Sequence, residues 1–118
     1  MGKDYKNLKV WQEAMELVKL VYLETRKLPK YELYALGDQL RRAAVSVPSN
    51  IAEGQRKNSR MEFVRFINIA VGSLAELETQ VILVRELYGL EINGVLEKIE
   101  LVFKLLFGLR KGLKLKDN

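Results

Sequence analysis

The sequence contains no cysteine and no histidine, and it has only two prolines in 118 residues. The two absences together exclude disulfides, thiolate nucleophiles, imidazole bases and zinc sites built from Cys and His. Carboxylates could still transfer protons or hold magnesium, so enzymes are disfavoured rather than excluded. We expect a protein that is not an enzyme and that carries no cofactor.

Long apolar runs are absent as well. No stretch of 18 or more apolar residues occurs, so no membrane span is expected. Residues 1–10 are polar and lysine-bearing and contain no apolar core, which argues against a secretory signal. The length fits one domain, residues 1–118, and the expected location is the cytoplasm.

What the sequence does contain is apolar residues at helical spacing. They predict four helices at about 8–27, 36–53, 60–88 and 94–111, followed by a basic tail at 112–118. No segment alternates with a period of two, and the connections are short, which favours antiparallel neighbours. The predicted fold is all-α, an antiparallel up-down-up-down four-helix bundle.

Local signals predict where these helices begin and end. Ser59 and Glu62 have capping-box spacing before the third helix, and Asn93 is a suitable N-cap for the fourth. Gly54 and Gly89 are expected to end the second and third helices as left-handed caps.

Four positions, three in the first helix and one in the third, allow a more specific prediction. Tyr22 falls on the apolar arc of the first helix and is expected in the core, whereas Leu20 and Leu23 fall on its polar side, where they could meet another subunit. Gly72 lies inside the third helix at a cost of about 1 kcal/mol relative to alanine, which suggests close backbone packing.

Pro48 lies inside the second predicted helix, and the apolar period continues on both sides of it. Proline in a helix interior costs about 3 kcal/mol, because it removes a hydrogen bond and clashes with an earlier carbonyl. The continuing period predicts a kink and not a break. Ser46, Ser49 and Asn50 are short donors that can satisfy freed backbone groups or contact an adjoining subunit.

Polar residues also enter the apolar faces of the second and third helices. The predicted structural network consists of Arg41, Arg42, Asn50, Glu53, Glu76 and Glu78. A charge near a bundle core is costly unless it is paired, so Glu78 is expected to pair with Arg41 or Arg42, or with Arg85, and to set the register. Two alternatives stay open: a catalytic or metal-binding carboxylate cluster of Glu53, Glu76 and Glu78, and a subunit interface.

The net charge is +5, and most of the excess lies near the two chain ends. The candidate nucleic-acid-binding residues are Lys104, Arg110, Lys111, Lys114 and Lys116, with Arg56, Lys57 and Arg60 as a separate patch in the second connection. Such clusters can attract nucleic acid, although a pair of solubilising tails explains them equally well. No aromatic platform for base stacking is evident.

Two stretches carry a family resemblance: QLRRAAVSVPSNIAEG at residues 39–54 and GSLAELETQ at residues 72–80. They resemble the signature of the 23S rRNA intervening-sequence proteins, also labelled S23 ribosomal proteins. The flanking helices agree in length and pattern, so the resemblance covers nearly the whole chain. It implies an antiparallel four-helix bundle that assembles as a ring-like homopentamer, with no established enzymatic activity or cofactor.

That family is in turn similar to the accessory variability proteins of diversity-generating retroelements, which are basic pentamers that associate with a reverse transcriptase and with nucleic acid. The resulting expectation is a homo-oligomeric bundle that binds the RNA or DNA backbone. The alternative is a protein-interaction scaffold, or an accessory subunit for a nucleic-acid enzyme such as a reverse transcriptase.

Overall fold

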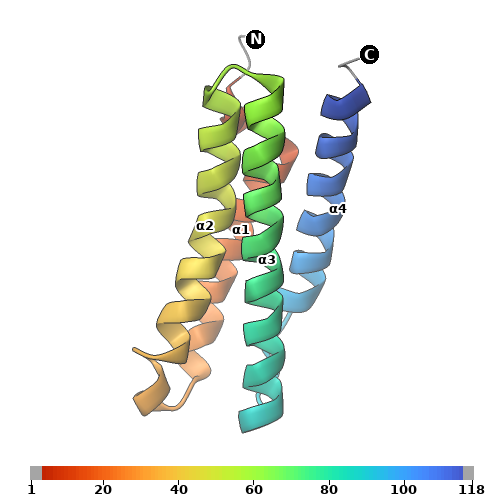
Figure 1. The fold of residues 1–118 in the computed structure, drawn as a ribbon. Helices are drawn as coiled ribbons and strands as arrows, with labels where there is room; N and C mark the ends of the chain where they lie inside the picture. The colour runs from red at the N-terminus through yellow and green to blue at the C-terminus, as the bar shows by residue number, and fades with distance from the viewer. Residues whose placement is uncertain (1–3, 116–118) are drawn as a thin grey trace.

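The computed structural model describes residues 4–115 of the chain. The long helices are α1 (Lys9–Glu24), α2 (Leu36–Arg56), α3 (Arg60–Tyr88) and α4 (Val95–Leu115), with short 3₁₀ turns η1 (Tyr5–Asn7), η2 (Thr25–Lys27) and η3 (Lys30–Glu32). Consecutive helices are antiparallel, and α4 returns to pack against both α3 and α1 (Figure 1). Residues 4–115 contain no strand, so the predicted all-α four-helix bundle is confirmed.

The core consists of aliphatic side chains that recur at helical spacing on every helix. Leu17, Leu40, Leu74 and Leu106, one from each helix, are fully buried. Tyr22 was expected among them but is 49% exposed, because its ring lies outside the core next to a guanidinium group of α2.

Leu20 and Leu23 do not share one environment. Leu20 is half-buried against the core, contrary to its expected place on the polar side. Leu23 is 53% exposed, as the helical wheel predicts.

The predicted limits of α3 are confirmed. Ser59 Oγ accepts a hydrogen bond from the Glu62 backbone N–H at 3.2 Å, and Gly89 ends the helix with φ 64°. Asn58 also has a positive φ, 58°, which lets the chain reverse sharply between α2 and α3.

The predicted start of α4, at about residue 94, agrees with the observed start to within one residue, but the predicted N-cap and the predicted end are wrong. The Gly94 carbonyl accepts the first helical hydrogen bond, from Lys98 N–H, so Asn93 is not the N-cap. The Asn93 N–H donates instead to the carboxylate of Glu24. The helix also continues to Leu115, well past residue 111.

Gly54 has a different role from the predicted one. It does not end α2 as a left-handed cap but lies buried within the helix, which continues to Arg56. A Cβ atom at Gly54 would lie 2.5 Å from Phe66 Cβ and 3.1 Å from the Phe63 ring, so the glycine allows α2 and α3 to approach closely. Gly72 was expected to serve this purpose, but a Cβ there would have nothing within 4 Å.

Helix α2 is continuous through Pro48, and its ribbon follows a curved path (Figure 1). Ser49 Oγ donates to the Val45 carbonyl at 2.8 Å, and Asn50 Nδ2 donates to the Ser46 carbonyl at 2.8 Å. Neither acceptor is the Ala44 carbonyl, which loses its helical donor because Pro48 has no N–H. These two bonds therefore do not satisfy the freed group as expected. The local kink at Pro48 stays a prediction.

By length and composition alone, α3 could cross a membrane. Eight of its apolar residues, however, are buried in the bundle, and a core helix of a soluble protein meets the same criterion. The burial of α3 among the other helices fits that second explanation.

The Glu24 carboxylate ties the end of α1 to the α3–α4 connection. It is only 8% exposed and accepts hydrogen bonds from Lys27 Nζ at 2.7 Å and from the Asn93 N–H at 3.0 Å. The hydrogen bond from Lys27 holds the pKa of the Glu24 carboxyl below its ordinary value of 4.5, although burial acts in the opposite direction.

Acid is therefore expected to weaken the fold through Glu24. Because the folded-state pKa lies below the unfolded one, the contribution is complete above about pH 4.5 and is lost as the pH falls through the folded-state pKa. Glu24→Gln should destabilise the protein by about 1–3 kcal/mol near neutral pH, and the gap from wild type should close in acid. Thermal denaturation at several pH values tests this, with the exposed Glu16→Gln as a control that changes little. A constant gap at every pH would contradict it.

Candidate nucleic-acid interface

One end of the bundle brings together segments that are far apart in the sequence. The turn between α2 and α3, the η1 segment and the C-terminal part of α4 all lie at the top of Figure 1. This follows from the up-down-up-down topology, which places the C-termini of α2 and α4 beside the N-termini of α1 and α3. We call it the basic end, defined by Lys6, Lys9, Arg56, Lys57, Arg60, Arg65, Arg110, Lys111 and Lys114.

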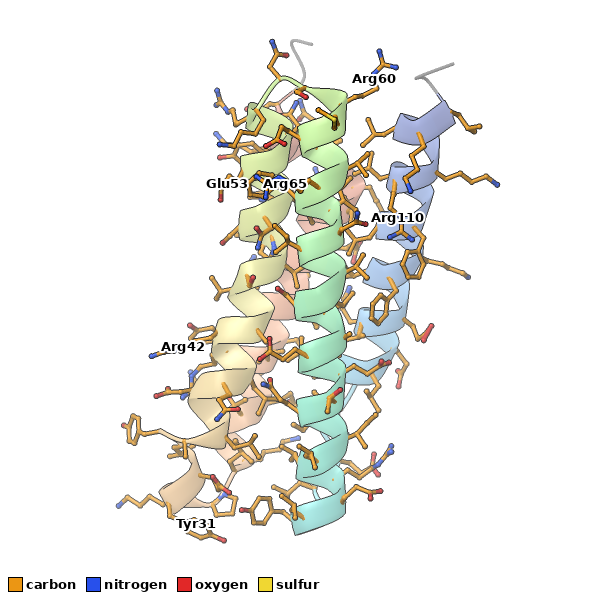
Figure 2. All side chains as sticks on the ribbon, viewed as in Figure 1. Tyr31, Arg42, Glu53, Arg60, Arg65 and Arg110 are labelled. Carbon is orange, nitrogen blue, oxygen red and sulfur yellow. The ribbon has the colours of Figure 1, made fainter. Side chains whose placement is uncertain are left out.

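The two patches that were distinct in the sequence thus share one end. Arg60 lies at the tip of the bundle, and Arg110 projects from α4 less than two turns before the helix ends (Figure 2). Lys104 lies farther down α4 and outside the basic end. Lys116 falls outside the described residues.

Several of these cations contact uncharged groups and not carboxylates. The Arg56 guanidinium carbon lies 5.8 Å from the centre of the Tyr5 ring, and Lys57 Nζ lies 5.6 Å from that of Phe66. Arg110 donates to Asn68 Oδ1 at 2.8 Å. Rings and amides orient a cation but carry no net charge, so the positive charge stays available to a phosphate.

Arg65 was missed as a candidate because it lies inside α3, more than one turn after the second connection to which the predicted patch was confined. It forms a two-pronged hydrogen bond to Glu62, at 3.2 and 3.1 Å, which lowers the pKa of the Glu62 carboxyl. Lys6 and Lys9 contribute to the positive charge near the N-terminus of the sequence, but they were not predicted to belong to the binding site. They lie near Asp4 and Glu13, so these three cations are already partly neutralised.

The polar contacts of α2 and α3 differ from those of the predicted network. Arg41 pairs with Asp38 at 2.6 Å and donates to Thr25 Oγ1 and to the Leu33 carbonyl. It therefore ties α2 to the α1–α2 connection. Within residues 4–115, no ion pair joins Glu78 to Arg41, Arg42 or Arg85, so the structure does not contain the predicted ionic contact that would set the register.

The link between α2 and α3 is instead uncharged. Ser46 Oγ and Ser73 Oγ form a hydrogen bond of 2.8 Å across the two helices, and Asn50 Nδ2 donates to Ser46 Oγ at 2.9 Å. The two hydroxyl groups and the Asn50 amide thus form the polar contact between α2 and α3 at this level.

The acidic members of the network do not converge. Glu53 lies near the C-terminal end of α2, and Glu76 and Glu78 lie near the middle of α3. Among the described residues, no group of three or more acidic side chains is close enough to hold a metal ion. The structure therefore does not bring together the carboxylate cluster that the sequence left open.

Comparison with known proteins places the chain in a family. No individually curated protein matches it. The model of the family described as 23S rRNA-intervening sequence protein matches residues 6–108, which include α1, α2, α3, the larger part of α4 and both stretches that carry the resemblance. The chain therefore belongs to the 23S rRNA-intervening sequence protein family.

Proposed function

We propose that this protein is a non-enzymatic homo-oligomer that binds the phosphate backbone of RNA or DNA through its basic end. The observation that supports this most is the gathering of cations from three chain segments at one end of the bundle, several of them held by rings or amides. The proposed location is the cytoplasm, and no cofactor is required.

Assembly would multiply the effect. Each chain carries +5, so the homopentamer that the family resemblance suggests would carry about +25. Copies that point in one direction would present their basic ends side by side, giving phosphates a larger positive surface than a single bundle offers.

Lysine and arginine contacts of this kind read the backbone and not the bases. Binding should therefore tolerate unrelated sequences and weaken steeply with salt, because each neutralised phosphate releases counterions. Titration of the wild-type protein with structured RNA and with duplex DNA, each at two salt concentrations, tests the proposal. Absence of binding even at low salt would contradict it.

A second candidate function is a protein-interaction scaffold or an accessory subunit of a nucleic-acid enzyme such as a reverse transcriptase. The opposite end of the bundle favours it, since Tyr31 and Tyr34 are 75% and 82% exposed there and Leu87 is 62% exposed (Figure 2 labels Tyr31). Exposed tyrosines beside apolar groups are typical of protein interfaces. Co-purification of a partner that survives nuclease and high salt would support this candidate.

A further inference from the structure

The outer face of α4 carries a stripe of charged and aromatic side chains that its own bundle covers only in part. Its members are Glu100, Phe103, Lys104, Phe107 and Lys111, which share one face at helical spacing. Phe103 packs against the core, and the Arg110 guanidinium carbon lies 5.0 Å from the centre of the Phe107 ring. Phe107 is 43% exposed, and its ring stacks on that of Phe103 with centroids 5.7 Å apart. Within residues 4–115, neither Glu100 nor Lys111 forms an ion pair. We call this the α4 stripe.

The outer face of α2 carries a second stripe with matching spacing. Arg42, Ser49 and Glu53 follow one another at intervals of seven and four, as Glu100, Phe107 and Lys111 do on α4. Arg42 points away from the bundle (Figure 2). We call Arg42, Val45, Ser49 and Glu53 the α2 stripe.

An apolar groove runs beside the α2 stripe. It has a volume of about 380 Å³ and lies between α1 and α2. Its apolar walls are Trp11, Met15, Val18, Val45, Pro48 and Ala52. It therefore offers a surface on which exposed phenyl rings can be buried.

Two contacts give the relative heights of the stripes along the bundle. Ser46 of α2 lies opposite Ser73 of α3, and Arg110 of α4 lies opposite Asn68 of α3. Because α3 is antiparallel to both helices, Arg110 is level with about residue 51 of α2.

The remaining levels follow from the rise per residue, which is equal in the two helices. Glu100 is level with Arg42, and Lys111 is level with Glu53, each to within about one helical turn, because the long Arg110 side chain can reach along the bundle axis. Phe107 falls between these pairs, level with Ser49. The two ends of each stripe are thus charged, with opposite signs at each level. Between them the α4 stripe carries Phe103, Lys104 and Phe107, and the α2 stripe carries Val45 and Ser49.

We propose that the α4 stripe of one copy packs on the α2 stripe and the adjoining groove of a second copy that points in the same direction. Rotation about an axis parallel to the bundle keeps every residue at its height, so Glu100 meets Arg42 of the next copy and Lys111 meets its Glu53. Phe103 and Phe107 then cover Val45 and the groove. Such a head-to-tail contact repeats from copy to copy, as rings require.

The charges also exclude the reverse arrangement. If the second copy were turned end for end, Glu100 would be level with Glu53 and Lys111 with Arg42, which places like charges together. The stripes therefore select parallel copies, whose basic ends all face one way. The inference deepens the assembly part of the proposed function and rests on it.

The apolar part of the contact is tested by Phe107→Asp. The wild-type mass in solution, measured by light scattering, should be that of an oligomer, and the variant should dissociate at least about a hundredfold more readily. Its circular dichroism should be unchanged, because Phe107 is not a core residue. Leu87→Asp is the matched control, since Leu87 is more exposed but lies outside both stripes.

The charged part is tested by reversal and rescue. Arg42→Glu and Glu100→Arg should each weaken assembly by on the order of tenfold at low salt, because an attraction becomes a repulsion. The double variant should recover assembly, since each contact again joins opposite charges. Rescue of this kind is not expected from a merely structural effect on the monomer.

Three outcomes would overturn the proposal. A monomeric wild type at micromolar concentration removes both this contact and the proposed assembly, while nucleic-acid binding by single bundles stays measurable by titration. An oligomer that resists Phe107→Asp and both charge reversals places the contact elsewhere and leaves the assembly intact. Failure of the double variant to recover, with both single variants impaired and folded, removes the pairing of Arg42 with Glu100.

Discussion

Replacing Gly54 with alanine is expected to lower the melting temperature, although alanine ordinarily stabilises a helix interior by about 1 kcal/mol relative to glycine. The added Cβ would lie 2.5 Å from Phe66 Cβ, an atom next to the backbone that cannot rotate away. Helices α2 and α3 must separate to relieve the clash, which disturbs the packing of Phe63 and Phe66 between them.

Overpacking of this kind costs about 1–3 kcal/mol net. For a domain of this size each kcal/mol corresponds to a fall of roughly 4 °C. Thermal denaturation followed by circular dichroism measures the effect.

Gly72→Ala is the matched control for this substitution. Gly72 is also a helix-interior glycine, but it is exposed, and a Cβ there has nothing within 4 Å. The control should be neutral or more stable than wild type by up to about 1 kcal/mol. If Gly54→Ala stabilised the protein as much as Gly72→Ala does, the close approach of α2 and α3 at Gly54 would be refuted.

The second large effect concerns nucleic-acid binding. A variant that carries Arg56→Gln, Lys57→Gln and Lys114→Gln should bind RNA and DNA roughly a hundredfold more weakly near 0.1 M salt. The slope of log K against log salt should become less steep by up to about 2.7, since three phosphate contacts are lost. Competition titrations over a range of salt concentrations measure both quantities.

The control variant removes the same charge from the opposite end of the bundle, with Arg26→Gln, Lys30→Gln and Arg85→Gln. These side chains are exposed, so the fold should tolerate their loss. A much smaller loss of affinity is expected, because phosphates at the basic end do not reach them. Equal losses in the two variants would mean that net charge alone attracts the nucleic acid, and an intact affinity in the first variant would place the binding surface elsewhere.

The positions and ends of the helices could be predicted from the sequence where they depend on residues close together in the chain. The apolar period predicted four helices, and Ser59 and Gly89 correctly marked the limits of α3, because capping depends on residues within one turn. Gly54 was misread as a cap, since its neighbour Phe66 comes twelve residues later on another helix. The end of α4 was placed too early because a glycine at 112 is tolerated inside a helix.

For the candidate site, the sequence likewise identifies the residues but not the contacts between distant segments. The basic residues themselves are plain in the sequence, but Arg56 and Arg110 appear there as parts of separate patches. Likewise, Glu78 was expected to pair with Arg41, Arg42 or Arg85, whereas Arg41 pairs with Asp38, one turn earlier on its own helix. Asp38 carries the same negative charge as Glu78 but lies within one turn of Arg41, so forming the pair requires less ordering of the side chains.

By itself, the sequence determined the helical class, the number of helices and most of the core, because these depend on periodicity and on neighbours within one or two turns. Only the tertiary structure decided that the cations of three segments meet at one end, that Gly54 lies against Phe66, and that Arg42 and Glu100 are level on opposite stripes. Each of these depends on the register between antiparallel helices, which is set by packing across the core and by the contact of Ser46 with Ser73.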